Sequence, residues 1–177
     1  MRTAFLASML FLAFSSLVAQ PQAQYNLKPL TFSKKDFVDS IQIEWERNQL
    51  IVPVEIGGKQ YRFLFDTGAA QCVIYADTPI KGCTTVGQIR SHDGGGHVSH
   101  VPMVIMPTMT LGRLRITGCQ ATMHERPVKG RRIDGILGFN IINKGISAKI
   151  DVRRQLLILT DRKDFSETNR AMTRATA

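Results

Sequence analysis

The chain has 177 residues, of which 44% are hydrophobic and 21% are charged. This is ordinary globular composition, and the length allows one domain with a real hydrophobic core. The formal net charge is +9, but the basic residues are scattered apart from Lys129, Arg131 and Arg132, and no nucleic-acid-binding motif accompanies them. We therefore interpret the charge as a solvated basic surface and expect no nucleic-acid partner.

Residues 1–23 have the pattern of a secretory signal peptide. Arg2 supplies a positive charge, residues 4–19 form an uncharged apolar run, and Ala19 and Ala23 are small residues suited to cleavage. The apolar run is short for a membrane span, and no second run follows it. The pattern favours export to the periplasm or out of the cell, without a stable membrane anchor, over a retained signal anchor.

Between residues 41 and 160, short apolar stretches alternate with turn signals at regular spacing. The expected hairpins lie at residues 50–65, 84–105, 109–116 and 147–160. About eight to ten short strands and one short helix at residues 139–143 predict an all-β fold, closed as a barrel or packed as a sandwich. Residues 24–40 are expected to form a linker or short pro-segment, and residues 161–177 a flexible tail.

Single residues add expectations about packing. Cys72 lies in an apolar run and is expected to be a small buried core residue. Cys83 and Cys119 each follow a glycine at a loop end and are the preferred disulfide pair, although sequence alone does not fix the connectivity. Pro53 is expected to place its strand at a sheet edge, and Trp45 is expected in the core.

Residues 61–75, Y-R-F-L-F-D-T-G-A-A-Q-C-V-I-Y, place one carboxylate between two apolar runs. An unpaired buried charge costs on the order of several kcal/mol or more, so Asp66 must be paired, protonated or used in chemistry. Gly68 permits a sharp turn after the first run, and Thr67 is expected to form a hydrogen bond within that turn.

Three features together resemble a retropepsin-like aspartic protease. They are F-L-F-D-T-G-A-A at residues 63–70, a glycine-tipped hairpin after it, and I-D-G-I-L-G-F-N-I-I at residues 133–142. Their order and spacing match the family over about residues 50–160. The resemblance implies a single-lobe acid-protease domain at residues 41–160 and an aspartic endopeptidase that needs neither a metal nor an organic cofactor.

The resemblance also assigns roles to residues, with Asp66 as the catalytic one. The loop that supports the carboxylate consists of Thr67, Gly68 and Ala69. The tip of a flap that closes over the substrate consists of Asp93, Gly94, Gly95 and Gly96. The clamp that threads behind the loop and holds it rigid consists of Ile136, Leu137 and Gly138.

The chain carries one Asp-Thr-Gly, whereas this chemistry needs two carboxylates that share one proton. A two-fold homodimer would bring two copies of Asp66 together, so the resemblance implies a homodimer that hydrolyses a peptide or protein substrate. Asp134 is a rival second carboxylate, although the family uses its equivalent structurally. Ala69 stands where pepsin-type chains carry a hydroxyl that would favour the ionised carboxylate, so we expect activity at mildly acidic to neutral pH.

Two other functions stay open at this stage. A domain of the same fold could be a catalytically inactive peptide-binding or interaction module. His92, His97 and His100, with Asp93 nearby, could bind zinc or copper. The spacing of these histidines matches no standard site, and the glycines between them would leave such a site floppy, so a metal site is not predicted.

Overall fold

The computed structural model of the chain describes residues 29–92, 95–127, 132–142 and 145–163. Within these ranges it is all-β, as the sequence predicts, with one short 3₁₀ helix and with fourteen strands rather than the expected eight to ten. No helix in the described part is long and apolar enough to cross a membrane. The expected signal peptide, residues 1–23, lies outside the described residues.

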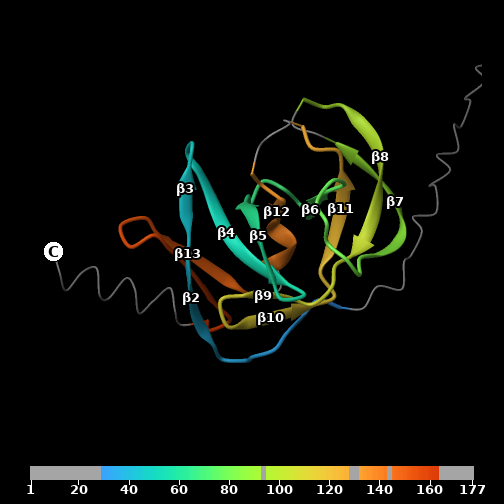
Figure 1. Ribbon diagram of the computed structural model, residues 1–177. Coiled ribbons are helices and arrows are strands. Elements are labelled where there is room, and N and C mark those ends of the chain that lie inside the picture. Colours follow the sequence, from blue (N-terminus) through green and yellow to red (C-terminus); the bar gives the residue numbers. More distant parts are fainter. Residues whose placement is uncertain (1–28, 93–94, 128–131, 143–144, 164–177) are drawn as a thin grey trace, which may run out of the picture.

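Most of the molecule is one curled sheet, and a smaller sheet packs beside it (Figure 1). The larger sheet has the order β1 (Thr31–Phe32), β10 (Leu114–Thr117), β9 (Met109–Leu111), β4 (Gln49–Ile56), β5 (Lys59–Phe65), β12 (Gly135–Leu137), β6 (Cys72–Tyr75), β11 (Gln120–His124), β8 (Val98–Ile105) and β7 (Thr84–His92), with β3 (Glu44–Glu46) paired to β4. The smaller sheet has the order β13 (Ser147–Asp151), β14 (Leu156–Thr160) and β2 (Val38–Gln42), and the helix η1 spans Phe139–Ile141.

The predicted β4–β5 hairpin turns at Gly57 and Gly58, whose φ angles are 60° and 76°. Two positive φ angles in a two-residue loop match the right-handed twist of the flanking strands, and glycine adopts them without steric cost. The turn sets the register in which Val52 faces Phe63, and both side chains are fully buried. This register carries β5 to the point where Asp66 follows it.

Pro53 does not lie on an edge strand, because β4 is paired on both sides. Pro53 lies opposite Arg62 in the β4–β5 ladder. The backbone N–H and C=O of Arg62 both bond Asp134 and not β4. Pro53 and Arg62 are therefore a pair without mutual hydrogen bonds, and the nitrogen of Pro53 points away from β5. On that other side, β3 pairs with residues 49–51 and β9 with residues 55–56. The missing N–H therefore falls in a gap between two partner strands, which is why an interior strand tolerates the proline.

Two further expectations about packing are wrong. Trp45 is 42% exposed. Its neighbours Glu44 and Glu46 both form ion pairs with Arg62 on one face of the sheet. Because successive side chains in a strand point to opposite faces, Trp45 points to the other face. The packed domain also begins before residue 41. Phe37 lies in the core, and β1, within the expected linker, pairs with β10.

The expected Cys83–Cys119 disulfide is also wrong. Residues next to Cys83 and Cys119 pair with opposite sides of β8, which separates the two cysteines by two strand spacings, about 10 Å. A disulfide needs Cα atoms within about 7 Å. Cys119 instead contacts Cys72, and both are buried free thiols.

Candidate active site

Asp66 is held at the end of β5 by a strand from much later in the chain. β12 lies between β5 and β6, parallel to β5 and antiparallel to β6. Its last residue, Leu137, accepts a hydrogen bond from the backbone N–H of Asp66 at 3.0 Å. The sheet therefore fixes the backbone of the candidate catalytic residue before the chain enters the turn.

The clamp works through close backbone contact behind the turn. A Cβ atom at Gly138 would lie 2.3 Å from the carbonyl oxygen of Gln71, and one at Gly135 would lie 2.3 Å from that of Val73. Real Cβ atoms do not approach backbone oxygen that closely, so only glycine fits these crossings. Phe139, the next residue, donates its N–H to the carbonyl oxygen of Ala69 at 2.7 Å. This bond holds the end of the Asp66 turn against the chain that follows β12.

Asp66 itself closes the turn. Its Oδ1 accepts the N–H of Gly68 at 2.9 Å, and its carbonyl oxygen accepts the N–H of Ala69 at 3.2 Å. Thr67 does not form the expected hydrogen bond within the turn. Its side chain is exposed, and the Gly68 N–H of the turn bonds Oδ1 of Asp66 instead. Asp66 is half-buried, which leaves its carboxyl group accessible from one side.

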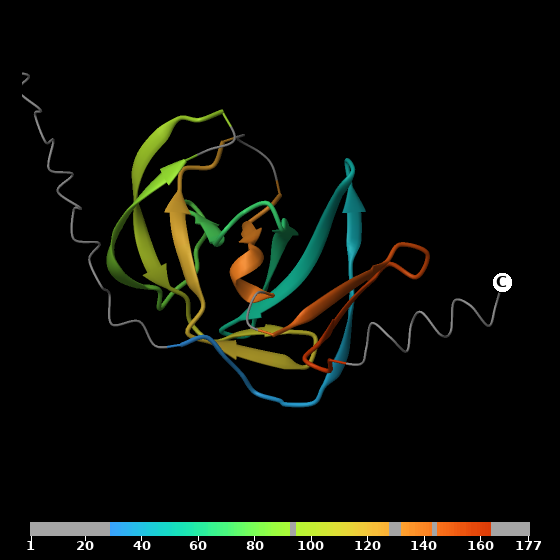
Figure 2. The ribbon, with the colours of Figure 1, turned by 180° about the vertical axis from the view of Figure 1, so that it is seen from behind.

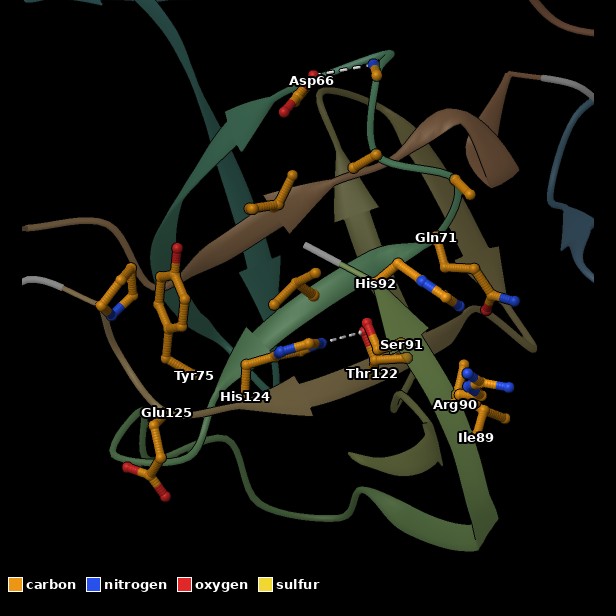
Figure 3. Close-up of a pocket in the computed structure, with 16 residues that line it drawn as sticks. Asp66, Gln71, Tyr75, Ile89, Arg90, Ser91, His92, Thr122, His124 and Glu125 are labelled. Atoms are coloured by element: carbon orange, nitrogen blue, oxygen red, sulfur yellow. Dashed lines mark hydrogen bonds between the residues drawn. The ribbon is translucent and has the colours of Figure 1, made fainter. Parts of the chain in front are cut away.

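Asp66 lines a cleft of about 910 Å³ beside β7 (Figure 3). Residues 89–92 of β7 form one wall of the cleft, so the strand that leads to the expected flap tip borders the site. Gly95 and Gly96 lie exposed beyond β7, whereas Asp93 and Gly94 lie outside the described residues. Of the clamp residues, Ile136 also lines the cleft.

Several cleft residues were not singled out from the sequence, among them Gln71, Tyr75, Thr122 and His124. Thr122 and His124 are two apart on β11 and therefore share a face, and Thr122 Oγ1 lies 3.0 Å from Nε2 of His124. Burial lowers the pKa of His124, so its imidazole is neutral at neutral pH. The i, i+2 pattern was visible in the sequence, but it did not reveal which face meets the cleft.

Gln71 lines the cleft, and its side chain has an unused hydrogen-bond acceptor. Its Oε1 is buried and has no hydrogen-bond partner in the described part of the chain. A buried polar atom without a partner costs about 1–3 kcal/mol. A ligand that donates a hydrogen bond at this point would remove that cost.

Asp134, the rival second carboxylate, does not join Asp66. Asp134 accepts the N–H of Arg62 through Oδ2 at 2.8 Å, and its own N–H bonds the carbonyl oxygen of Arg62 at 2.7 Å. It therefore joins the segment before β12 to β5 as a structural residue. Glu125 lines the cleft at the end away from Asp66, with its side chain directed outward (Figure 3).

The histidine-based metal site finds no support in the described ranges. No group of three or more His, Cys, Asp or Glu side chains there could hold a metal ion. His92 lies on β7 and His100 on β8, where their register partners are Val98 and Arg90. Neither histidine therefore faces another across the hairpin.

We compared the chain with protein families and with solved structures to identify its family. Residues 52–141, about half of the chain, match the family model described as aspartyl protease. Among solved structures, the chain is similar to a retropepsin-like aspartic protease from Rickettsia conorii, with 14% identity and a TM-score of 0.47 over 75% of this chain and 96% of that one. No curated protein sequence matches significantly. The family match covers the Asp66 turn, the β7–β8 hairpin and the β12 clamp, and it confirms the resemblance inferred from sequence: the chain belongs to the aspartyl protease family.

Proposed function

We propose that this protein is an aspartic endopeptidase that works as a homodimer, with Asp66 of each subunit forming the catalytic pair. The observation that carries the proposal is the position of Asp66: its backbone is locked by β12 while its carboxyl group opens into the cleft. One chain supplies one such carboxylate, and an isologous two-fold interface places identical residues against each other.

The two carboxylates share one proton, because like charges so close cannot both ionise easily. The ionised one removes a proton from a water molecule, which attacks the scissile carbonyl carbon. The protonated one donates its proton to the carbonyl oxygen, and the tetrahedral intermediate then collapses as the leaving nitrogen is protonated. The bond from Gly68 N–H to Oδ1 of Asp66 orients the carboxylate for these transfers.

An extended peptide fits the cleft better than a compact ligand. β7 ends the sheet order, so its outer edge has no strand partner in the described part of the chain. A peptide strand can pair with such an edge through its main chain, while alternate side chains enter the cleft. The substrate is thus a peptide or an unfolded protein segment.

The surface beside the catalytic turn suits a second subunit. Phe139, whose N–H bonds the loop of Asp66, is 44% exposed. Ile150 and Val152 are also exposed, and the β13–β14 and β3–β4 hairpins project on the side away from β7 and β8 (Figure 2). Burial of such apolar side chains favours association.

The signal-peptide pattern of residues 1–23 supports export, so we propose that the dimer works in the periplasm or outside the cell.

The proposal is tested by mixing subunits. Wild-type protein and Asp66→Asn protein are unfolded together, refolded in equal amounts and incubated with a peptide library. A shared pair of carboxylates predicts about one quarter of the wild-type activity, because only dimers with two wild-type subunits cleave. Activity of about one half would indicate that each chain acts alone. If wild-type protein binds peptides but does not cleave them, the endopeptidase proposal is wrong and the protein is an inactive binding module.

A further inference from the structure

The thiols of Cys72 and Cys119 form a buried pair that the proposed peptidase chemistry does not use. The thiol of Cys119 donates a hydrogen bond to Sγ of Cys72 across 3.7 Å, and both residues are 0% exposed. Cys72 opens β6, and Cys119 immediately precedes β11, which pairs in parallel with β6. The strand pairing therefore holds the two sulfur atoms side by side.

Further contacts of Cys72 fix the pair in the folded protein. Its Sγ also accepts the N–H of Gly138 at 3.4 Å. The hydrogen bond from Cys119, with a further contribution from Gly138, lowers the pKa of Cys72, while the same contact and burial raise the pKa of Cys119. These hydrogen bonds hold the Sγ atoms of Cys72 and Cys119 next to each other in the packed protein.

We propose that Cys72 and Cys119 form a disulfide bond when the chain folds in an oxidising environment, and that Cys83 stays a free thiol. The oxidant is a small disulfide such as oxidised glutathione. The thiolate of one of the two cysteines attacks one of its sulfur atoms and releases one glutathione. The thiolate of the other cysteine then attacks the chain's sulfur atom in this mixed disulfide and releases the second glutathione. Two thiols lose two electrons and two protons, and the oxidant is reduced to two thiols.

The bond would join two strands that build the cleft. β6 follows the catalytic turn directly, and β11 carries Thr122 and His124. The two cysteines are separated by 47 positions in sequence, so closing that loop removes much conformational freedom from the unfolded chain. Both sulfur atoms are inaccessible in the folded protein, so the exchange takes place before β6 and β11 have docked.

The test is peptide mapping of the full chain after refolding with oxidised and reduced glutathione. Free thiols are trapped with iodoacetamide before digestion. We expect one cross-linked peptide pair that contains Cys72 and Cys119, and alkylation at Cys83 alone. Alkylation of all three cysteines, or a cross-link that includes Cys83, would overturn the proposal. The mapping uses wild-type protein and no activity readout, so it is independent of the peptidase proposal.

Thermal unfolding gives a second readout. Protein refolded with oxidant should unfold about 10 °C higher than the same protein refolded with excess reductant. The Cys83→Ser variant is the matched control and should show the same difference. Equal unfolding temperatures in oxidised and reduced wild-type protein, or a difference that disappears in Cys83→Ser, would contradict the assignment.

Discussion

The backbone N–H of Asp66 donates to the carbonyl oxygen of Leu137, at 3.0 Å, and this bond places the candidate catalytic residue in the ladder between β5 and β12. Phe65, the residue before it, is the register partner of Leu137. The position of the carboxylate is therefore set by long-range strand pairing and only then by its own turn. Changes in the clamp should act on Asp66 without touching it.

The Gly138→Ala variant tests the clamp. The new Cβ would meet the carbonyl oxygen of Gln71 at 2.3 Å and that of Ala69 at 2.9 Å, both backbone atoms that cannot rotate away. We expect the free energy of unfolding to fall by about 3 kcal/mol, measured by urea denaturation.

Gly57→Ala is the matched control for that variant. Gly57 has a φ of 60° and nothing within 4 Å of the added Cβ, so the cost is backbone strain alone, about 1 kcal/mol. Equal losses in the two variants would mean that Gly138 is not held by close backbone contact.

Asp134→Asn separates a structural aspartate from a catalytic one. The asparagine carbonyl oxygen can still accept the N–H of Arg62 that Asp134 Oδ2 accepts at 2.8 Å. We expect kcat/KM close to that of wild type, whereas Asp66→Asn should lower it about 10³-fold through loss of acid–base catalysis. Circular dichroism verifies the fold of both variants. A folded Asp134→Asn protein that is as inactive as Asp66→Asn would place Asp134 in the chemistry.

Local signals in the sequence predicted the features that depend on neighbouring residues. Gly57-Gly58 defined the β4–β5 hairpin because a two-residue turn needs positive φ. Asp66 and the Ile136–Gly138 segment were identified together because their order and spacing form one pattern. The structure brings them together as expected, through the pairing of β12 with β5.

Features that depend on strand order or on the facing of strands could not be read in this way. The cysteine pairing was wrong because the sequence does not show that β8 separates β7 from β11. Trp45 was assigned to the core because its alternation with polar residues does not reveal that Glu44 and Glu46 both face Arg62. His124 was missed because residues from several other strands form the cleft, and the sequence does not show that the His124 side chain lines it.

Ala69→Ser tests the expected pH range. A serine hydroxyl near the carboxylate would donate a hydrogen bond to its charged form and so favour ionisation. We expect the acid limb of the pH–rate profile to move to lower pH in this variant, while wild-type protein is most active at mildly acidic to neutral pH. The profile is measured with one peptide substrate in buffers of constant ionic strength. A strongly acidic wild-type optimum, or a shift of the acid limb to higher pH in the variant, would contradict this.

Gln71→Leu tests whether the unused acceptor in the cleft contacts substrate. Leucine removes a buried Oε1 that has no partner in the described part of the chain, so the free protein should be as stable as wild type or more stable. If Oε1 accepts a hydrogen bond from bound peptide, kcat/KM should fall about tenfold, equivalent to about 1.4 kcal/mol. Gln60→Leu, at an exposed position of β5 outside the cleft, is the control and should leave kcat/KM unchanged. A lower unfolding temperature with unchanged kcat/KM would instead assign Gln71 a purely structural role, because only a substrate contact lowers turnover while leaving the free protein intact.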